Sequence, residues 1–115
     1  MLIDEDLLGE VLAALDQSTV IVVHGLFMGQ SPVLAAQAAD ADTPLPERAE
    51  AAHTLKGLAL QFGLSHLCET LAALERACRD DDALLSGRLS SELGDLLKRS
   101  SEALDRHLQS RGIPV

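Results

Sequence analysis

Apolar residues, mostly leucine and alanine, recur every three or four positions through most of the chain. This spacing places them along one side of an α-helix. It predicts five helices, separated by short polar segments, at about Glu5–Leu15, Ser18–Ala39, Pro46–Phe62, His66–Arg79 and Ala83–Gln109. Only Thr19–Val23 also suits a β-strand, and no second β-branched run exists to pair with it.

The expected helix ends carry side chains that commonly begin or terminate helices. Asp4, Ser18 and Ser65 each stand where a side-chain oxygen could accept a hydrogen bond from the first backbone N–H groups of a helix. Gly63 follows the third helix, where a left-handed glycine often ends a helix. Pro32 lies within the second helix and predicts a kink or a restart there.

The composition supports an all-α fold. The chain has 23 Leu and 16 Ala, but only three Ile, two Phe and no Trp or Tyr, and leucine and alanine favour helix. Short segments between consecutive helices favour antiparallel neighbours. We therefore expect an antiparallel up-down four-helix bundle with an additional short N-terminal helix covering one end. A length of 115 residues suits a single domain over residues 1–115.

The charge and the apolar runs restrict the partners. A net charge of −9 repels nucleic acid and anionic membranes. No apolar run was found to reach the roughly 18 residues of a membrane-spanning helix, and no secretory signal is recognisable. We expect a cytoplasmic protein that binds neither nucleic acid nor membrane.

Cysteine and histidine supply no metal or disulfide site. Cys68 and Cys78 are ten residues apart on one expected helix, which separates their Cα atoms by roughly 15 Å, too far for a disulfide. His66 with these cysteines lacks the ligand spacing of a zinc site. His24 and His107 are expected to be structural or solvated. The sequence implies no metal and no cofactor.

His53 stands apart from this apolar framework. On a helical wheel the core side of the third helix is formed by Ala52, Leu55, Leu58, Ala59 and Phe62. His53 falls roughly opposite that side, so it should be exposed. Its neighbours one or two turns away on the helix surface are Ala49, Glu50, Lys56, Gly57 and Leu60.

The small side chains around His53 suggest that another protein approaches closely. Gly57 within a helix costs about 1 kcal/mol relative to alanine, and close contact with a partner could compensate for that cost. An exposed histidine is nevertheless most often only solvated, and a lysine three residues later is ordinary. These residues alone therefore do not name a reaction.

The segment Ala52-His53-Thr54-Leu55-Lys56-Gly57, followed by Gly63 and by Leu74-Glu75 on the next helix, resembles the signature of histidine-containing phosphotransfer (HPt) domains. The order and lengths of the helices fit that family over essentially the whole chain. The resemblance implies a four-helix bundle whose exposed histidine carries a phosphoryl group between receiver domains of two-component phosphorelays.

The resemblance also implies roles for individual residues. His53 would be the phosphoacceptor, Lys56 the cation beside the phosphoryl group, and Gly57 the point of close approach by the receiver. Glu75 stands where the family has a polar residue that hydrogen-bonds Nδ1 of the histidine. An ordinary ion pair with Arg79, four residues later, is the alternative for Glu75, and the wheel makes its reach to His53 long.

The expected docking surface has Leu60, Ala49 and Gly57 at its centre, with Lys56 and Arg48 at its rim. In the family a small or polar residue often follows Lys-Gly, whereas this chain has Leu58. Because of this difference, the resemblance does not predict which receiver the protein binds. The expected partners are response-regulator receiver domains, with a hybrid sensor kinase as one source.

The leading interpretation is a monomeric phosphocarrier without kinase activity of its own, because no glycine-rich nucleotide loop is present. It would accept a phosphoryl group on His53 from a receiver aspartyl phosphate and pass it to another receiver. One alternative is a non-catalytic helical module that binds a receiver or kinase without carrying phosphate. Another is a fragment of the dimerising helical region of a kinase.

Overall fold

The computed structural model describes residues 1–115 and contains five α-helices and no strand. The helices are α1 (Glu5–Ala14), α2 (Gln17–Ala39), α3 (Leu45–Leu60), α4 (Ser65–Arg79) and α5 (Ala83–Ser110). The all-α prediction is therefore confirmed, and the segment Thr19–Val23 is helical. The expected helix boundaries agree with the observed ones to within two residues.

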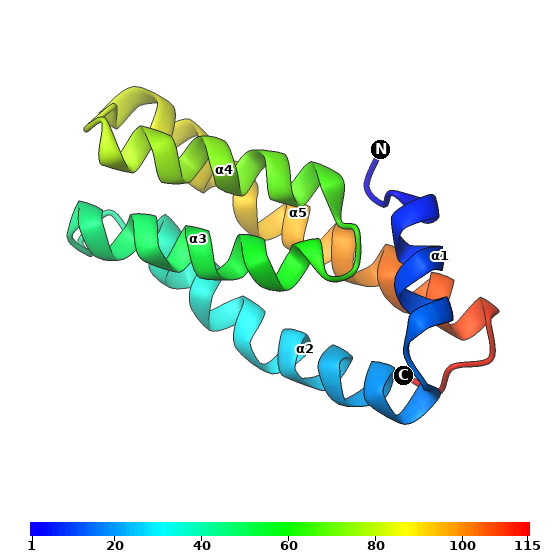
Figure 1. The fold of residues 1–115 in the computed structure, drawn as a ribbon. Helices are drawn as coiled ribbons and strands as arrows, with labels where there is room; N and C mark the ends of the chain where they lie inside the picture. Colours follow the sequence, from blue (N-terminus) through cyan, green and yellow to red (C-terminus); the bar gives the residue numbers. More distant parts are fainter.

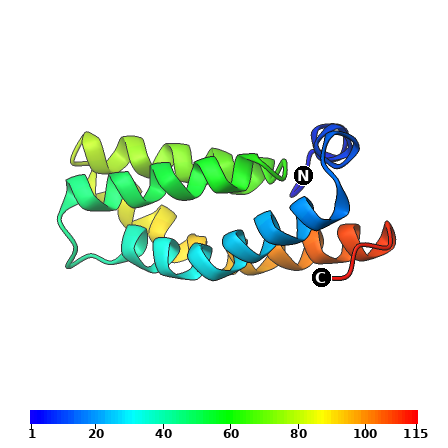
Figure 2. The ribbon, with the colours of Figure 1, turned by 60° about the horizontal axis from the view of Figure 1, so that its bottom comes forward.

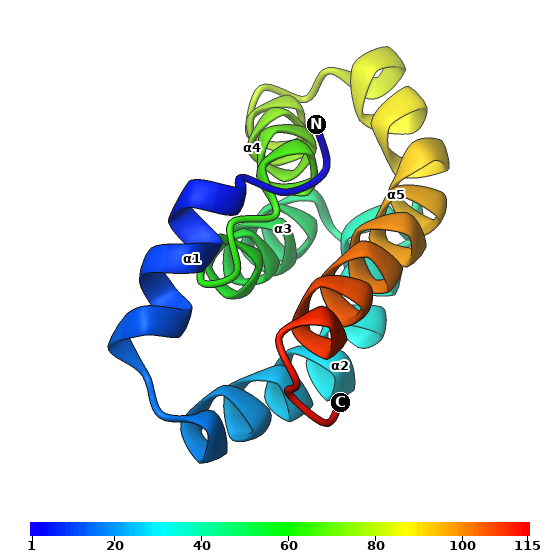
Figure 3. The ribbon, with the colours of Figure 1, turned by 90° about the vertical axis from the view of Figure 1, so that its right-hand side faces the viewer.

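Four helices lie side by side and α1 lies across one end of them. Each of α2, α3, α4 and α5 packs against two of the others, and α3 with α4 is the most extensive pair. Consecutive helices from α2 to α5 run in opposite directions (Figure 1). In Figure 2, α1 is seen nearly end-on while the other helices cross the view, and Figure 3 shows it beside the ends of α3 and α4.

All five helices contribute to one hydrophobic cluster of 24 buried residues. Leucines of α3, α4 and α5 supply much of it, and the rings of Phe27 and Phe62 meet edge to face with centroids 6.0 Å apart. Leu8 of α1 is fully buried, so the short helix closes one end of the core. Leu58, expected in the core, is partly buried at its margin.

Two of the three expected helix caps are wrong. The Asp4 carboxylate accepts a hydrogen bond from Leu7 N at 3.1 Å, as predicted. Helix α2 begins earlier than expected, so Asp16 caps it by accepting from Thr19 N at 2.8 Å. Ser18 lies inside the helix and donates to the Asp16 carboxylate. Ser65 is the first residue of α4, which has no side-chain cap.

Gly63 is required where the chain turns from α3 to α4. Its φ of +64° is in the left-handed region, which glycine adopts without a Cβ clash. Its carbonyl accepts a hydrogen bond from Asp4 N at 2.7 Å, and an added Cβ would lie 2.9 Å from Asp4 O. The same glycine therefore ends α3 and allows the segment before α1 to pack against this turn.

Helix α2 corrects two expectations. It is continuous through Pro32, so of the two alternatives for this proline the restart is wrong and the kink stays a prediction. Its 23 residues contain no Asp, Glu, Lys or Arg, and by length and composition it could cross a membrane, contrary to the expectation that no such segment exists. Core helices can share this length and composition, and α2 packs against both α3 and α5.

Candidate functional site

His53 lies on the outer side of α3. Ala52, Leu55 and Ala59 of the same helix are fully buried, while the His53 side chain remains 57% exposed. The helical period accounts for this placement, because residues that alternate every three or four positions fill the core and leave the opposite side in solvent. The imidazole is thus accessible to another molecule.

Glu75 of α4 reaches this imidazole directly. Its Oε1 lies 3.1 Å from Nδ1 of His53, across the contact between α3 and α4. The helical wheel suggested that Glu75 has a long reach to His53. The contact forms because α3 and α4 pack closely against each other. Sequence spacing alone cannot supply this distance, since it depends on how two helices cross.

The same carboxylate binds two cations. Lys56 Nζ lies 3.3 Å from Oε1, the oxygen that faces His53. Arg79 approaches the other oxygen, Oε2, at 3.2 Å. The two alternatives for Glu75, a contact with His53 and an ion pair with Arg79, therefore occur together, one on each oxygen.

Glu75 is ionised at neutral pH. Burial by itself would raise the pKa of this carboxyl, but hydrogen bonds from His53, Lys56 and Arg79 outweigh it and hold the pKa below its ordinary value. A carboxylate only accepts hydrogen bonds. In a neutral imidazole the proton of this contact must therefore be on Nδ1 of His53, which leaves the lone pair on Nε2.

Three charged side chains meet beside His53. Glu75 contributes one negative charge, and Lys56 and Arg79 contribute two positive charges. These three side chains together have one net positive charge, whereas the whole chain has a charge of −9. An incoming dianionic group would be attracted by these two cations.

Gly57 and Leu60 lie on the exposed part of α3 near His53. Apart from the two neighbouring residues and the backbone of α3 itself, no heavy atom lies within 4 Å of the position that a Cβ on Gly57 would take, so the space over this glycine is open. Leu60 is 57% exposed, which is high for a large apolar side chain beside an extensive core. Both residues are placed as the sequence analysis expected.

Ala49 does not belong to this surface. It is fully buried, so its expected place at the centre of a docking surface is wrong. Ala49 precedes Lys56 by seven residues and so shares its side of the helix, and Lys56 contacts Glu75 of α4. A short alanine on this side is buried, whereas the longer side chain of Lys56 remains 32% exposed.

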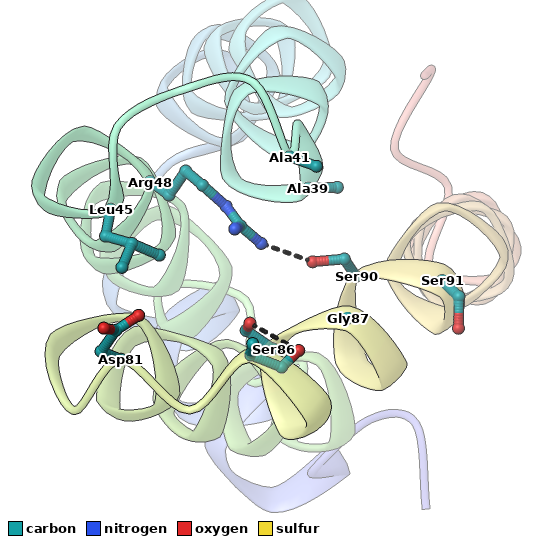
Figure 4. A pocket seen from close by; sticks show the side chains of 10 residues that line it. Ala39, Ala41, Leu45, Arg48, Asp81, Ser86, Gly87, Ser90 and Ser91 are labelled. Atoms are coloured by element: carbon teal, nitrogen blue, oxygen red, sulfur yellow. Dashed lines mark hydrogen bonds between the residues drawn. The ribbon is translucent and has the colours of Figure 1, made fainter.

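Arg48 does not lie at the rim of a docking surface, so this expectation is also wrong. Arg48 is only 6% exposed. Nε donates to Ala38 O and Nη2 donates to Ser90 Oγ, both at 3.0 Å. Arg48 lines a pocket that is formed mainly by residues of α2, α3 and α5. Figure 4 shows its guanidinium pointing toward α5 in this pocket. Arg48 therefore joins the end of α2 to α5, where a cation is favourable for the terminal carbonyls.

The two cysteines take no part in the site. Both are free, and burial raises the pKa of each thiol, so they remain protonated and weakly nucleophilic at neutral pH. The Cys68 thiol lies 3.7 Å from Lys56 O, where it packs α4 against α3. Cys78 is buried in the core.

Comparison with known proteins agrees with this geometry at the level of the family. Searches of curated proteins and of solved structures gave no significant match. A family model described as Hpt domain matches residues 5–105 of the 115 residues. The matched range holds His53, Lys56 and Glu75, and it extends from the start of α1 into α5. The chain therefore belongs to the Hpt domain family.

Proposed function

We propose that this protein carries a phosphoryl group on His53, which it accepts from the aspartyl phosphate of one receiver domain and passes to another. Hpt domains act in histidine phosphotransfer within phosphorelays, as phosphocarriers rather than kinases, and they interact with receiver domains. The observation that carries the proposal for this chain is the exposed imidazole whose Nδ1 contacts the Glu75 carboxylate.

The tautomer makes Nε2 the attacking atom. Its lone pair forms a bond to phosphorus while the bond from phosphorus to the aspartyl oxygen breaks, and that electron pair returns to the receiver carboxylate. The Nδ1 proton stays in place, and the resulting positive ring lies against Glu75. No proton needs to move in either direction, which suits a carrier that must also release the group.

Lys56 is proposed to neutralise the transferred group. A phosphoryl group adds nearly two negative charges, and phosphoryl transfer depends mainly on positioning and charge stabilisation. The Lys56 side chain is 32% exposed and its Nζ already lies beside Oε1 of Glu75. A flexible lysine at this position can contact both the carboxylate and a group on the neighbouring imidazole.

The docking face is proposed to extend from α3 onto α2. We define it as His53, Gly57 and Leu60 of α3 together with Val22 and Leu26 of α2. Val22 and Leu26 are 61% and 52% exposed, and α2 packs directly against α3. An apolar surface without charged side chains on α2 suits a partner that must bind and dissociate repeatedly.

The central test is chemical. Incubation with a phosphorylated receiver domain should place an acid-labile, base-stable phosphate on His53 of this protein. His53→Gln should stay folded and acquire no such phosphate. Detection of the same phosphate on the variant would overturn the assignment, and failure of the wild-type protein with every receiver from the same cell would overturn the carrier function.

The docking face is tested separately from the chemistry. Leu60→Asp and Leu26→Asp should each slow transfer from a receiver by about tenfold, because a charge replaces an apolar contact. Leu84→Asp on α5 is the matched control, since Leu84 is 88% exposed. Phosphorylation by the small donor phosphoramidate should be unchanged in all three. Equal rates of transfer from the receiver in the three variants would contradict the proposed docking face.

We also propose the finer organisation that accompanies this role. The helices would form an antiparallel up-down bundle that acts as one domain over residues 1–115, as a monomer in the cytoplasm. Support comes from the single hydrophobic cluster and from the net charge of −9, which disfavours association of identical copies. Light scattering at micromolar concentration would show a monomer of the chain mass of 12.2 kDa.

A further inference from the structure

Arg79 occupies a position beside the proposed nucleophile without touching it. It lies one helical turn after Glu75 on α4, and its guanidinium binds Oε2 at 3.2 Å. His53 and Lys56 both bind the other oxygen, Oε1. The carboxylate is therefore held from two sides, and only one of those sides faces the imidazole.

Without Arg79, the Glu75 carboxylate would be held only at Oε1, where His53 and Lys56 bind it. The last torsion of its side chain is broad and nearly two-fold, so the carboxylate rotates readily. If Oε2 had no partner, rotation of the group would weaken its contact with Nδ1 and allow the other imidazole tautomer. A guanidinium on Oε2 opposes this rotation, because it presents several donors in a rigid plane.

We propose that Arg79 is a positioning residue, which holds Oε2 of Glu75 so that Oε1 stays on Nδ1 of His53 and the lone pair stays on Nε2. This inference rests on the proposed phosphocarrier function for its consequence, but it concerns the unphosphorylated protein. It assigns to an exposed arginine a role that is exerted through Glu75 and not by contact with the phosphoryl group.

Arg76 provides a matched control within the same helix turn. It is an exposed arginine that lines the same surface pocket as Lys56, Glu75 and Arg79. It makes no side-chain hydrogen bond and no ion pair in the structure, unlike Arg79. Replacement of either arginine removes one positive charge from the pocket that Lys56 and Glu75 line, so the comparison separates the contact with Glu75 from the local charge.

The first experiment measures the tautomer directly. Long-range ¹H–¹⁵N correlation spectra of histidine-labelled protein should be recorded near pH 8.5, about two units above the ordinary histidine pKa. The ratio of Nδ1–H to Nε2–H forms of His53 should fall by about threefold to tenfold in Arg79→Gln, the range expected within one hydrogen-bonded network. Arg76→Gln should leave the ratio unchanged. An unchanged ratio in Arg79→Gln would overturn the proposal.

The second experiment asks whether Arg79 acts through Glu75. Arg79→Gln should slow phosphoryl transfer in the wild-type background by a similar factor, and should have no further effect in a Glu75→Gln background. An equal loss in both backgrounds would mean that Arg79 acts directly on the phosphoryl group, which would overturn the proposal. Circular dichroism confirms folding, which the 51% exposure of the Arg79 side chain favours.

The two proposals fail in different ways. If the tautomer shifts in Arg79→Gln but no receiver phosphorylates the wild-type protein, the positioning contact stands and the carrier function falls. If phosphate is transferred to His53 but the tautomer is indifferent to Arg79, the carrier function stands and the positioning role falls.

Discussion

Two histidine–carboxylate pairs in this protein use the same chemical groups in different surroundings. His53 of α3 meets Glu75 of α4 with its Nδ1 at 3.1 Å, and its side chain is 57% exposed. His24 of α2 meets Asp105 of α5 with its Nε2 at 2.6 Å, and its side chain is 12% exposed. One ring keeps its other nitrogen toward solvent, whereas the other ring is enclosed.

The two pairs differ in exposure more than in chemistry, and this difference is why His53 rather than His24 is proposed as the nucleophile. The His24 ring packs edge-on against Phe62, with centroids 6.4 Å apart, so its pair joins α2 to α5 over the core. The carboxylate of Glu75 instead contacts an imidazole that remains accessible. The expectation that His24 is structural or solvated agrees with its enclosed position.

The largest contrast is expected in phosphoryl transfer. His53→Gln should lose transfer from a phosphorylated receiver by more than about a thousandfold, since no nucleophile remains. His24→Gln should keep its transfer rate to within about threefold, because its ring contacts Asp105 and Phe62 and not the docking face. Rapid-quench labelling with both variants checks this. A transfer defect as large in His24→Gln would erase the contrast.

Stability should show the opposite order. His24→Ala should lower the free energy of unfolding by about 2 kcal/mol, because it leaves the Asp105 carboxylate without its partner and removes packing against Phe62. His53→Ala should change it by less than about 0.5 kcal/mol, as is usual at exposed positions. Urea denaturation followed by circular dichroism measures both. The comparison fails if His53→Ala proves the more destabilising substitution.

The carboxylates should differ in the same sense as the histidines. Glu75→Gln should slow transfer by about tenfold, because an amide can donate as well as accept and no longer fixes the proton on Nδ1. Asp105→Asn should leave transfer unchanged. Initial rates with a single phosphorylated receiver decide between them, and wild-type rates in Glu75→Gln would reduce Glu75 to an ion-pair partner of Arg79.

The smallest expected effect is the pH-dependent contribution of Glu75 to the free energy of unfolding. Since the pKa of Glu75 in the folded protein is depressed below its ordinary value of 4.5, its charge stabilises the fold at higher pH. That contribution is lost as the pH falls through the folded-state pKa. Wild type should exceed Glu75→Gln by about 1 kcal/mol at pH 7, and the difference should vanish in acid. A difference that stays constant down to about pH 3 would contradict the depressed pKa.

Several features of the site were predictable because they depend on neighbours in the same helix. The exposure of His53, the open space over Gly57 and the exposed Leu60 follow from the period of α3. The left-handed conformation of Gly63 follows from its position after a helix. The expected cap of α2, Ser18, is wrong, and Asp16 caps the helix instead. Both residue types are good caps, so only the residue at which the helix begins decides between them.

Contacts between helices were predicted less well. Ala49 was assigned to the surface because a single helical wheel has no neighbouring helix to cover its flank. Arg48 was treated as an ordinary exposed cation, although it reaches Ala38 O and Ser90 of two other helices. The apolar composition of α2 was also underestimated, because its small polar residues interrupt the run of strongly hydrophobic ones without adding any charge.

The sequence by itself determined the five helices, the family signature and the side of α3 on which His53 lies, because these depend on short-range periodicity and local residue type. Only the tertiary structure decided that Glu75 reaches Nδ1, that Lys56 shares its carboxylate with Arg79, and that His24 pairs with Asp105. These contacts between helices join residues between 19 and 81 positions apart. Their distances depend on how the helices cross, and the packing of the shared core sets that crossing.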